Sequence, residues 1–115
     1  MKRTLDSFKY AWSGLKTVWR EEVNFQIEVL AGLLVVICLL RFQFTFIESV
    51  FCVVAILIVL SAEILNTVIE DLCNKLQPNH DPVIGKIKDM MASFVFLSSV
   101  GALIVGLIIF FHHFS

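Results

Sequence analysis

Three polar residues interrupt an otherwise apolar stretch between Phe46 and Leu72. Glu63, Asn66 and Glu70 are spaced by three and four residues, so on a helix they share one face. Ionisable side chains in such a segment are energetically costly and usually face a protein interior or water. A carboxylate shielded from water accepts a proton readily, which suits a general base. This face therefore predicts a functional site, with Glu63 as its base.

More polar residues collect at the ends of the neighbouring apolar segments. Glu22 precedes the first segment, and Lys88 and Asp89 precede the third. Asn74 continues the face of Glu70 by one more helical turn. Magnesium prefers a few carboxylates together with substrate phosphates, and lysine binds phosphate as a point charge. The pattern predicts chemistry with a divalent metal and a phosphate-bearing substrate.

Three apolar segments must position these residues. They cover about residues 25–41, 46–72 and 88–112, and an amphipathic segment covers residues 1–23. A bilayer core of about 30 Å requires roughly 20 helical residues. The 115 residues are 58% hydrophobic with a mean hydropathy of +0.88, whereas an ordinary soluble domain is about half apolar. We therefore expect one all-α membrane domain (residues 1–115) with three transmembrane helices.

The amphipathic segment places large apolar side chains on one helical stripe. Its basic residues lie on the other faces, and such a helix with tryptophans is typical of a membrane interface. A helix packed on a soluble core is the alternative. The stripe consists of Leu5, Phe8, Trp12, Leu15 and Trp19. We expect a helix that lies in the membrane–water interface.

Lysine and arginine are distributed unevenly about the expected spans. A proline-containing loop is expected over residues 75–88 and a tight turn over residues 41–45. Eight basic residues lie in the N-terminal arm and the loop, against Arg41 alone on the other side. The positive-inside rule then places the N-terminus in the cytoplasm. Glu70 would lie near the cytoplasmic surface, and Glu63, seven residues away, about 10 Å deeper.

Each acidic residue also has a purely structural interpretation. Glu70 could form an interfacial salt bridge with Lys75, and Glu22 could form one with Arg20. Glu63 could serve only as a polar contact between helices. These alternatives stay open on the sequence alone.

The remaining candidate ligands give no further site. The three cysteines are odd in number and lack metal-ligand spacing, so we interpret them as small hydrophobes. His112 and His113 are terminal and lie on the far side, and we assign them no role. The chain has neither common glycine-rich phosphate loop.

Several motifs match one known family in order and spacing. The chain resembles the small bacterial integral-membrane diacylglycerol kinases, including their undecaprenol kinase relatives. The most specific stretch is Glu63-Ile-Leu-Asn66-Thr67-Val-Ile-Glu70. The resemblance extends from about Arg3 to the end of the third segment. The other matching motifs are Tyr10-x-Trp12-x-Gly14, Glu22-x-Asn24-Phe25 and Lys88-Asp89.

The resemblance implies a homotrimer whose active sites are shared between neighbouring subunits and open to the cytoplasm. It also implies that Glu63 is the base on a lipid hydroxyl, while Glu22 and Glu70 hold Mg²⁺ bound to ATP. Glu22 and Glu70 thus belong to the nucleotide site as well. Lys88 and Asp89 are implied to contact or organise that site.

The remaining implied residues support the site or the lipid. Asn66 is implied to support the active site, and Arg3 occupies a position associated with the lipid pocket. Trp12 is implied to be a substrate-side residue. Asn74 belongs to the nucleotide site, although the family often has Asp there, and Met91 stands where small residues are common.

The substrate cues are mixed. Trp12 and Glu28 resemble the diacylglycerol kinase branch, whereas Asn24-Phe25 resembles the branch that phosphorylates undecaprenol. We expect an ATP-dependent lipid kinase of the bacterial inner membrane that phosphorylates diacylglycerol, with undecaprenol as the alternative substrate.

Two other classes of protein remain as alternatives. One is a non-enzymatic membrane scaffold, and the other is a small ion or proton transporter that uses Glu63 and Glu70 as a relay. The apolar outer halves of the segments argue against a transporter. A net charge of −1 gives no indication of a nucleic-acid partner.

Overall fold

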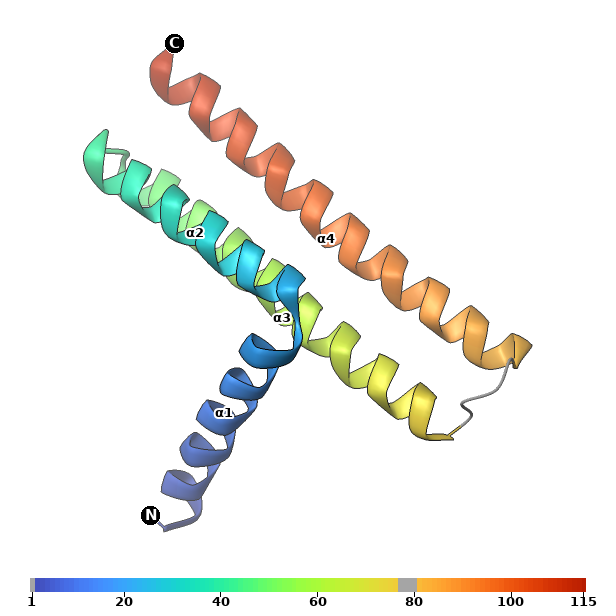
Figure 1. Ribbon diagram of the computed structural model, residues 1–115. Helices are drawn as coiled ribbons and strands as arrows, with labels where there is room; N and C mark the ends of the chain where they lie inside the picture. Colours follow the sequence, from blue (N-terminus) through green and yellow to red (C-terminus); the bar gives the residue numbers. More distant parts are fainter. Residues whose placement is uncertain (1, 77–80) are drawn as a thin grey trace.

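Four helices make up the fold. The computed structural model describes residues 2–76 and 81–115. The helices are α1 (Lys2–Glu21), α2 (Val23–Arg41), α3 (Phe46–Leu76) and α4 (Pro82–Phe114). Helices α2, α3 and α4 run up and down one bundle, and α1 leaves it at a steep angle (Figure 1). The described residues contain no strand, which confirms the all-α expectation.

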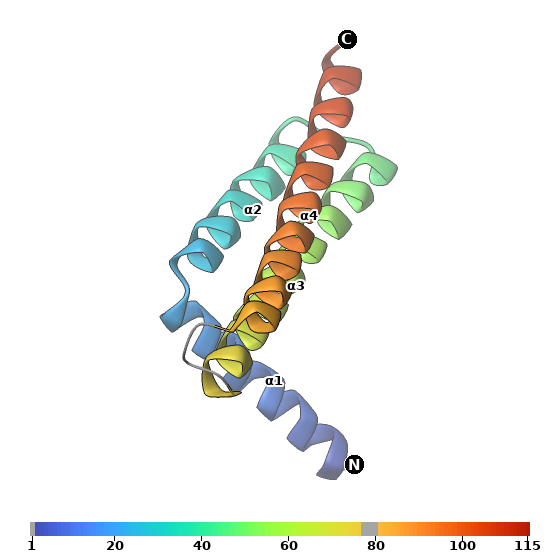
Figure 2. The ribbon, with the colours of Figure 1, turned by 90° about the vertical axis from the view of Figure 1, so that its right-hand side faces the viewer.

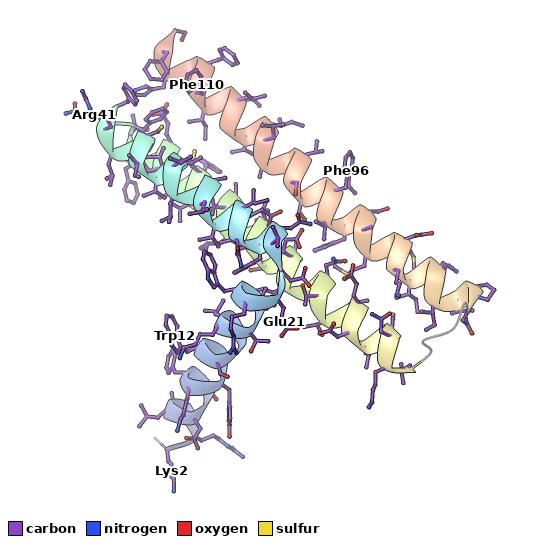
Figure 3. All side chains as sticks on the ribbon, viewed as in Figure 1. Lys2, Trp12, Glu21, Arg41, Phe96 and Phe110 are labelled. Carbon is purple, nitrogen blue, oxygen red and sulfur yellow. The ribbon has the colours of Figure 1, made fainter. Side chains whose placement is uncertain are left out.

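Helices α2, α3 and α4 are each long and apolar enough to cross a membrane. Helix α4 packs along α3 but has no side chain that is buried in the structure, and large residues such as Phe96 point away from the bundle (Figure 3). Such a helix is stable when lipid or another apolar surface covers it. The chain is therefore a multi-pass membrane protein with three transmembrane helices, as the sequence predicted.

Helix α1 crosses the end of the bundle and carries the N-terminus away from it (Figure 2). Its apolar stripe is largely exposed, and Trp12 points away from α2 and α3 (Figure 3). Only Val18, near the end of the helix, is buried. An exposed aromatic stripe beside three spans fits an interfacial helix.

One face of α2 packs on α3. Phe25, Gly32 and Leu39 are the buried residues of α2, and their spacing of seven keeps them on one side of the helix. At Gly32 a Cβ atom would lie 2.9 Å from Cγ2 of Ile56, which is closer than packed side chains allow. The absence of a side chain at Gly32 therefore permits the close approach of α2 and α3.

The turn between α2 and α3 is fixed by a reciprocal cap. Thr45 and Glu48 bond each other: the Glu48 amide donates to Thr45 Oγ1 at 3.2 Å, and the Thr45 amide donates to Glu48 Oε1 at 2.8 Å. This capping box satisfies amides that the first helical turn leaves without partners. Gln43, in the turn, has a positive φ of 52°. The cap sets where α3 begins.

The loop expected over residues 75–88 is shorter in the structure. Helix α4 already begins at Pro82, because the Asp81 carboxylate accepts a hydrogen bond of 2.8 Å from the Val83 amide. A proline in the first helical turn is compatible with this start, whereas the sequence pattern alone indicates Pro82 as a loop residue. Residues 77–80, which hold the rest of the predicted loop, lie outside the described residues.

Candidate functional site

Glu63 lies at the centre of the predicted polar face. It is only 5% exposed, although it is charged at neutral pH in its ordinary form. Glu22 and Glu70 are the charged groups that act on it through space. Its backbone carbonyl accepts a hydrogen bond of 3.0 Å from the Thr67 hydroxyl, one turn later. The structure therefore brings two predicted acids, Glu22 and Glu70, to the shielded carboxyl group of the third, Glu63.

Glu28 is a fourth acid at this site, although from the sequence it is only a cue to the substrate. Its carboxyl group lies beside the carboxyl group of Glu63. Its Oε2 atom is buried and has no hydrogen-bond partner among the described residues. The available signal was the position of Glu28 in the first two turns of the same span, six residues after Glu22. The site is thus more acidic than predicted.

Asn66 orients Glu70 rather than Glu63. The Asn66 side-chain amide donates to Glu70 Oε1 at 3.2 Å, one helical turn further along α3. Glu70 itself is exposed. The bond occupies one carboxylate oxygen and leaves the other free to bind a ligand. Asn66 therefore supports an acid that faces outward.

Glu22 occupies the corner between α1 and α2. It is the single residue between the two helices, and its backbone is extended, with φ −117° and ψ 108°. Its amide bonds back to the Val18 carbonyl at 2.9 Å. Beyond the corner, the Gln26 side chain donates to the Trp19 carbonyl, which ties the two helices together. The position of the Glu22 carboxylate is thus coupled to both helices.

Lys88 is connected to α3 through Asn74. The Lys88 ammonium donates to Asn74 Oδ1 at 2.7 Å, which joins α4 to the far part of α3. Because an amide is neutral, this bond positions the ammonium without cancelling its charge. Asp89 lies next to Lys88 and is exposed. The departure at Asn74 from the acidic residue common in the family leaves a free positive charge here.

The described part of the chain supplies no complete metal site of its own. Residues 2–76 and 81–115 contain no group of three His, Cys, Asp or Glu side chains placed to hold an ion. Magnesium bound to a nucleotide needs only one or two protein carboxylates, because phosphates and water complete its shell. Glu22 and Glu70 are the two predicted ligands, and as a pair they meet this lower requirement.

The alternative salt bridges do not form. Among the described residues, the one ion pair within 4 Å joins His113 to Glu48, at the opposite end of the bundle. Glu70 is therefore not paired with Lys75, nor Glu22 with Arg20. The acids at the site keep their charges available for another partner.

Arg3 and Trp12 lie apart from the acidic cluster, on α1. Trp12 is 61% exposed, and the Lys16 ammonium lies 5.8 Å from the centroid of its ring. Arg3 is exposed near the start of the helix. Within one chain, neither side chain reaches Glu63. In this structure, these two residues, which are predicted to act on the lipid side, make no direct contact with the acids.

A cavity of about 580 Å³ lies between α2, α3 and α4. Glu28 lines it near the site, and Phe42, Phe44 and Phe110 line its far end. Apart from Glu28 and Ser99, its lining residues are apolar, glycine or cysteine. A proton or ion path needs polar groups along its length. The cavity therefore does not support the transporter alternative.

Comparison with known proteins places the chain among lipid kinases. Residues 9–110 match the family model described as prokaryotic diacylglycerol kinase. The chain is 29% identical over 113 residues to the diacylglycerol kinase of Escherichia coli K12, covering 98% of this chain and 93% of that protein. It is 33% identical over 110 residues to the undecaprenol kinase of Bacillus subtilis, covering 96% and 89%.

Proposed function

We propose that this chain, which belongs to the prokaryotic diacylglycerol kinase family, transfers the γ-phosphate of ATP to a membrane lipid alcohol. As a member of that family it is a lipid kinase with an alcohol acceptor. The observation that carries the proposal is the shielded Glu63, flanked by Glu22 and Glu70 at one end of the spans. A scaffold would have no need of such a cluster of uncompensated acids.

In the proposed reaction Glu63 is the general base. It takes the proton of the lipid hydroxyl as the hydroxyl oxygen forms a bond to the γ-phosphorus and the bond to the β-phosphate oxygen breaks. Phosphoryl transfer depends mainly on positioning and charge stabilisation. A base shielded from water, at the depth where a lipid hydroxyl meets the surface, meets the positioning requirement.

Glu22 and Glu70 are proposed to hold Mg²⁺ together with ATP. When bound, the ion neutralises phosphate charge. Asn66 keeps one oxygen of Glu70 occupied and so fixes its direction. Lys88, held by Asn74, supplies a further positive charge for the phosphates, and Asp89 is proposed to organise the same nucleotide site.

Diacylglycerol, giving phosphatidic acid, is the proposed substrate, and undecaprenol is the second candidate. Glu28 and Trp12 favour the first because both resemble the diacylglycerol kinase branch, and Glu28 lies against Glu63. The greater identity to the Bacillus undecaprenol kinase, although over slightly fewer residues, favours the second. Arg3 and Trp12, on the interfacial helix, are proposed to contact the lipid.

The proposed setting is the bacterial inner membrane, with the N-terminus in the cytoplasm and three copies of the chain sharing active sites. The excess of basic residues on the side of α1 supports this orientation. The exposed surface of α4 leaves an apolar face that a second copy could cover. Cross-linking of the purified protein in micelles tests the trimer, because a monomeric protein would give no cross-linked dimer or trimer.

The activity is tested with labelled ATP and purified protein in mixed micelles, with diacylglycerol and undecaprenol supplied in parallel. We expect Mg²⁺-dependent label in the lipid fraction, with more label in diacylglycerol. Label in neither lipid would refute the kinase assignment for this chain. More label in undecaprenol would be consistent with the proposed mechanism but would show that undecaprenol, not diacylglycerol, is the preferred substrate.

A further inference from the structure

A second polar cluster lies at the end of the bundle opposite the acids, and the proposed function does not use it. It consists of His113 near the end of α4, Glu48 at the start of α3, and the turn before it. Nδ1 of His113 lies 3.1 Å from Glu48 Oε1, and Nε2 lies 3.1 Å from the Phe42 carbonyl oxygen. The His113 ring also stacks on Phe44, with 3.9 Å between ring centroids.

Both nitrogens of His113 face acceptors. A carbonyl oxygen cannot donate a hydrogen bond, and Glu48 Oε1 already accepts one from the Thr45 amide. A neutral imidazole carries one N–H, so it can satisfy one of these contacts while its other nitrogen turns a lone pair toward oxygen. An imidazolium carries two N–H groups and satisfies both. The observed geometry therefore matches the protonated ring.

The charged surroundings of His113 are few. Glu48 is the only acidic residue between Glu28 and Glu63, and α4 has none after Asp89. From the turn, Arg41 places its guanidinium over the ring of Phe42. The Cys52 thiol lies one turn beyond Glu48 and interacts electrostatically with the Glu48 carboxylate. His112, next along α4, is exposed and its ring makes no hydrogen bond among the described residues.

The cluster also closes the far end of the apolar cavity. Phe42, Phe44 and Phe114 all line that cavity. Phe114 packs edge-on against both other rings, with centroids 5.6 and 5.8 Å apart. Figure 3 shows this end, where Arg41 is labelled at the end of α2 and Phe110 near the tip of α4. The rings of Phe42, Phe44 and Phe114 thus line this end of the cavity, and the His113 ring is stacked on one of them, Phe44.

We propose that His113, Glu48 and the Phe42 carbonyl form a proton-dependent clasp that closes this end of the cavity. With the ring protonated, α4 is tied to the α2–α3 turn by two hydrogen bonds. When the ring loses a proton, one bond is lost and an unfavourable lone-pair contact replaces it. The tip of α4 then separates from the turn, and the wall opens beside Cys52.

Two native cysteines allow a direct test. Cys52 is buried, lines the cavity and lies beside the clasp, whereas Cys73 is buried at the other end of α3 and serves as the internal reference. The full-length protein in micelles is treated with a polar maleimide at pH 6 and pH 8, and the labelling of Cys52 is divided by that of Cys73. Imidazole changes its charge in this interval, between about pH 5 and 8.

We expect the Cys52-to-Cys73 ratio to rise at least threefold from pH 6 to pH 8. In His113→Gln, whose side chain cannot ionise, the ratio should be the same at both pH values. His112→Gln is the matched control, because it removes a neighbouring histidine outside the clasp, and it should behave as the unmodified protein. A flat ratio in the unmodified protein, or an equal rise in His113→Gln, would overturn the proposal.

A second variant keeps the test decisive if His113→Gln does not fold. Glu48→Gln keeps the size of the side chain and removes the charge that favours the protonated ring. We expect its ratio at pH 6 to match that of the unmodified protein at pH 8. A ratio at pH 6 equal to the unmodified value would contradict a role for the ion pair. Neither residue belongs to the proposed active site, so kinase activity at pH 6 should be retained in both.

Discussion

The two ends of the bundle use acidic residues in opposite ways. At the end near α1, Glu22, Glu28 and Glu63 lie together, and no basic residue of the described ranges 2–76 and 81–115 is within ion-pair distance of them. At the other end, Glu48 accepts hydrogen bonds from its own cap and faces His113. The difference separates acids that are proposed to bind a ligand from an acid that caps a helix and contacts α4. Uncompensated charge in a membrane protein is costly, so its presence indicates a ligand.

Both ends also fasten α4, but they do so differently. Near the acids, a single bond from Lys88 to Asn74 joins α4 to α3 and leaves the ammonium charged. At the far end, His113 is held by two polar contacts and a stacked ring. The first attachment keeps a charge available, whereas the second sets an imidazole ring against a carboxylate and a backbone carbonyl. Four substitutions test this contrast between the two ends.

The largest effect is expected from Glu63→Gln. The amide keeps the shape of the side chain but cannot take a proton, and general-base catalysis contributes roughly 10²–10⁴-fold to rate. Lipid phosphorylation in mixed micelles should fall by about that factor. Glu48→Gln, which alters an acid of the same helix at the other end, is the control and should retain near-normal turnover at pH 6. Full activity in Glu63→Gln would show that Glu63 is not the general base.

Glu70→Gln should change the metal requirement. Losing one of two carboxylate ligands weakens metal binding, and we expect the Mg²⁺ concentration for half-maximal activity to rise about tenfold, which corresponds to about 1.4 kcal/mol. The measurement is a magnesium titration at saturating ATP. Asp71→Asn provides the control, because it neutralises the neighbouring exposed acid. An unchanged titration in Glu70→Gln would mean that the metal lies elsewhere.

Asn74→Leu should act on the nucleotide through Lys88. A hydrogen bond to a charged group contributes roughly 1.5–3 kcal/mol, so loss of the contact should raise the KM for ATP about tenfold or more, with a smaller change in kcat. Asn74→Asp still offers an acceptor and should recover most of the affinity. Equal KM values in the leucine and native proteins would show that Lys88 needs no support from α3.

The smallest effect is expected from Thr45→Ala at the far end. Loss of an N-cap side chain typically costs about 1 kcal/mol of stability. The midpoint of thermal unfolding in micelles should decrease, while kinase activity at low temperature should not change. Thr17→Ala is a suitable control, since the Thr17 hydroxyl bonds only to a carbonyl one turn back within exposed α1. A loss of activity in Thr45→Ala would show that the two ends are coupled.

The sequence predicted the spans well because apolar length and helical period are local properties. The segments that contain Glu63 and Lys88 were placed correctly on helices of one membrane bundle. The start of α4 was missed because Pro82 signals both loops and first helical turns, and only the Asp81 cap distinguishes the two. Boundary errors of this kind arise where one residue type fits two conformations.

Pairwise contacts between helices were beyond the sequence alone. The spacing of Glu63, Asn66 and Glu70 indicated one face of a single helix, yet it could not show that Lys88 on α4 bonds to Asn74 on α3. His113 was given no role because it is terminal, and its partner Glu48 is 65 residues away. Such contacts depend on how helices cross, and periodicity does not encode that geometry.

The corner at Glu22 has a mechanical consequence. Helix α1 contains 20 residues and is therefore about 30 Å long, and its last turn meets the extended residue Glu22. In the proposed setting, this helix lies on the lipid surface and the corner at its end carries a proposed metal ligand. A tilt of the helix would then turn the Glu22 carboxylate, so that the tension and packing of the surrounding lipid would act on the proposed site of phosphate transfer.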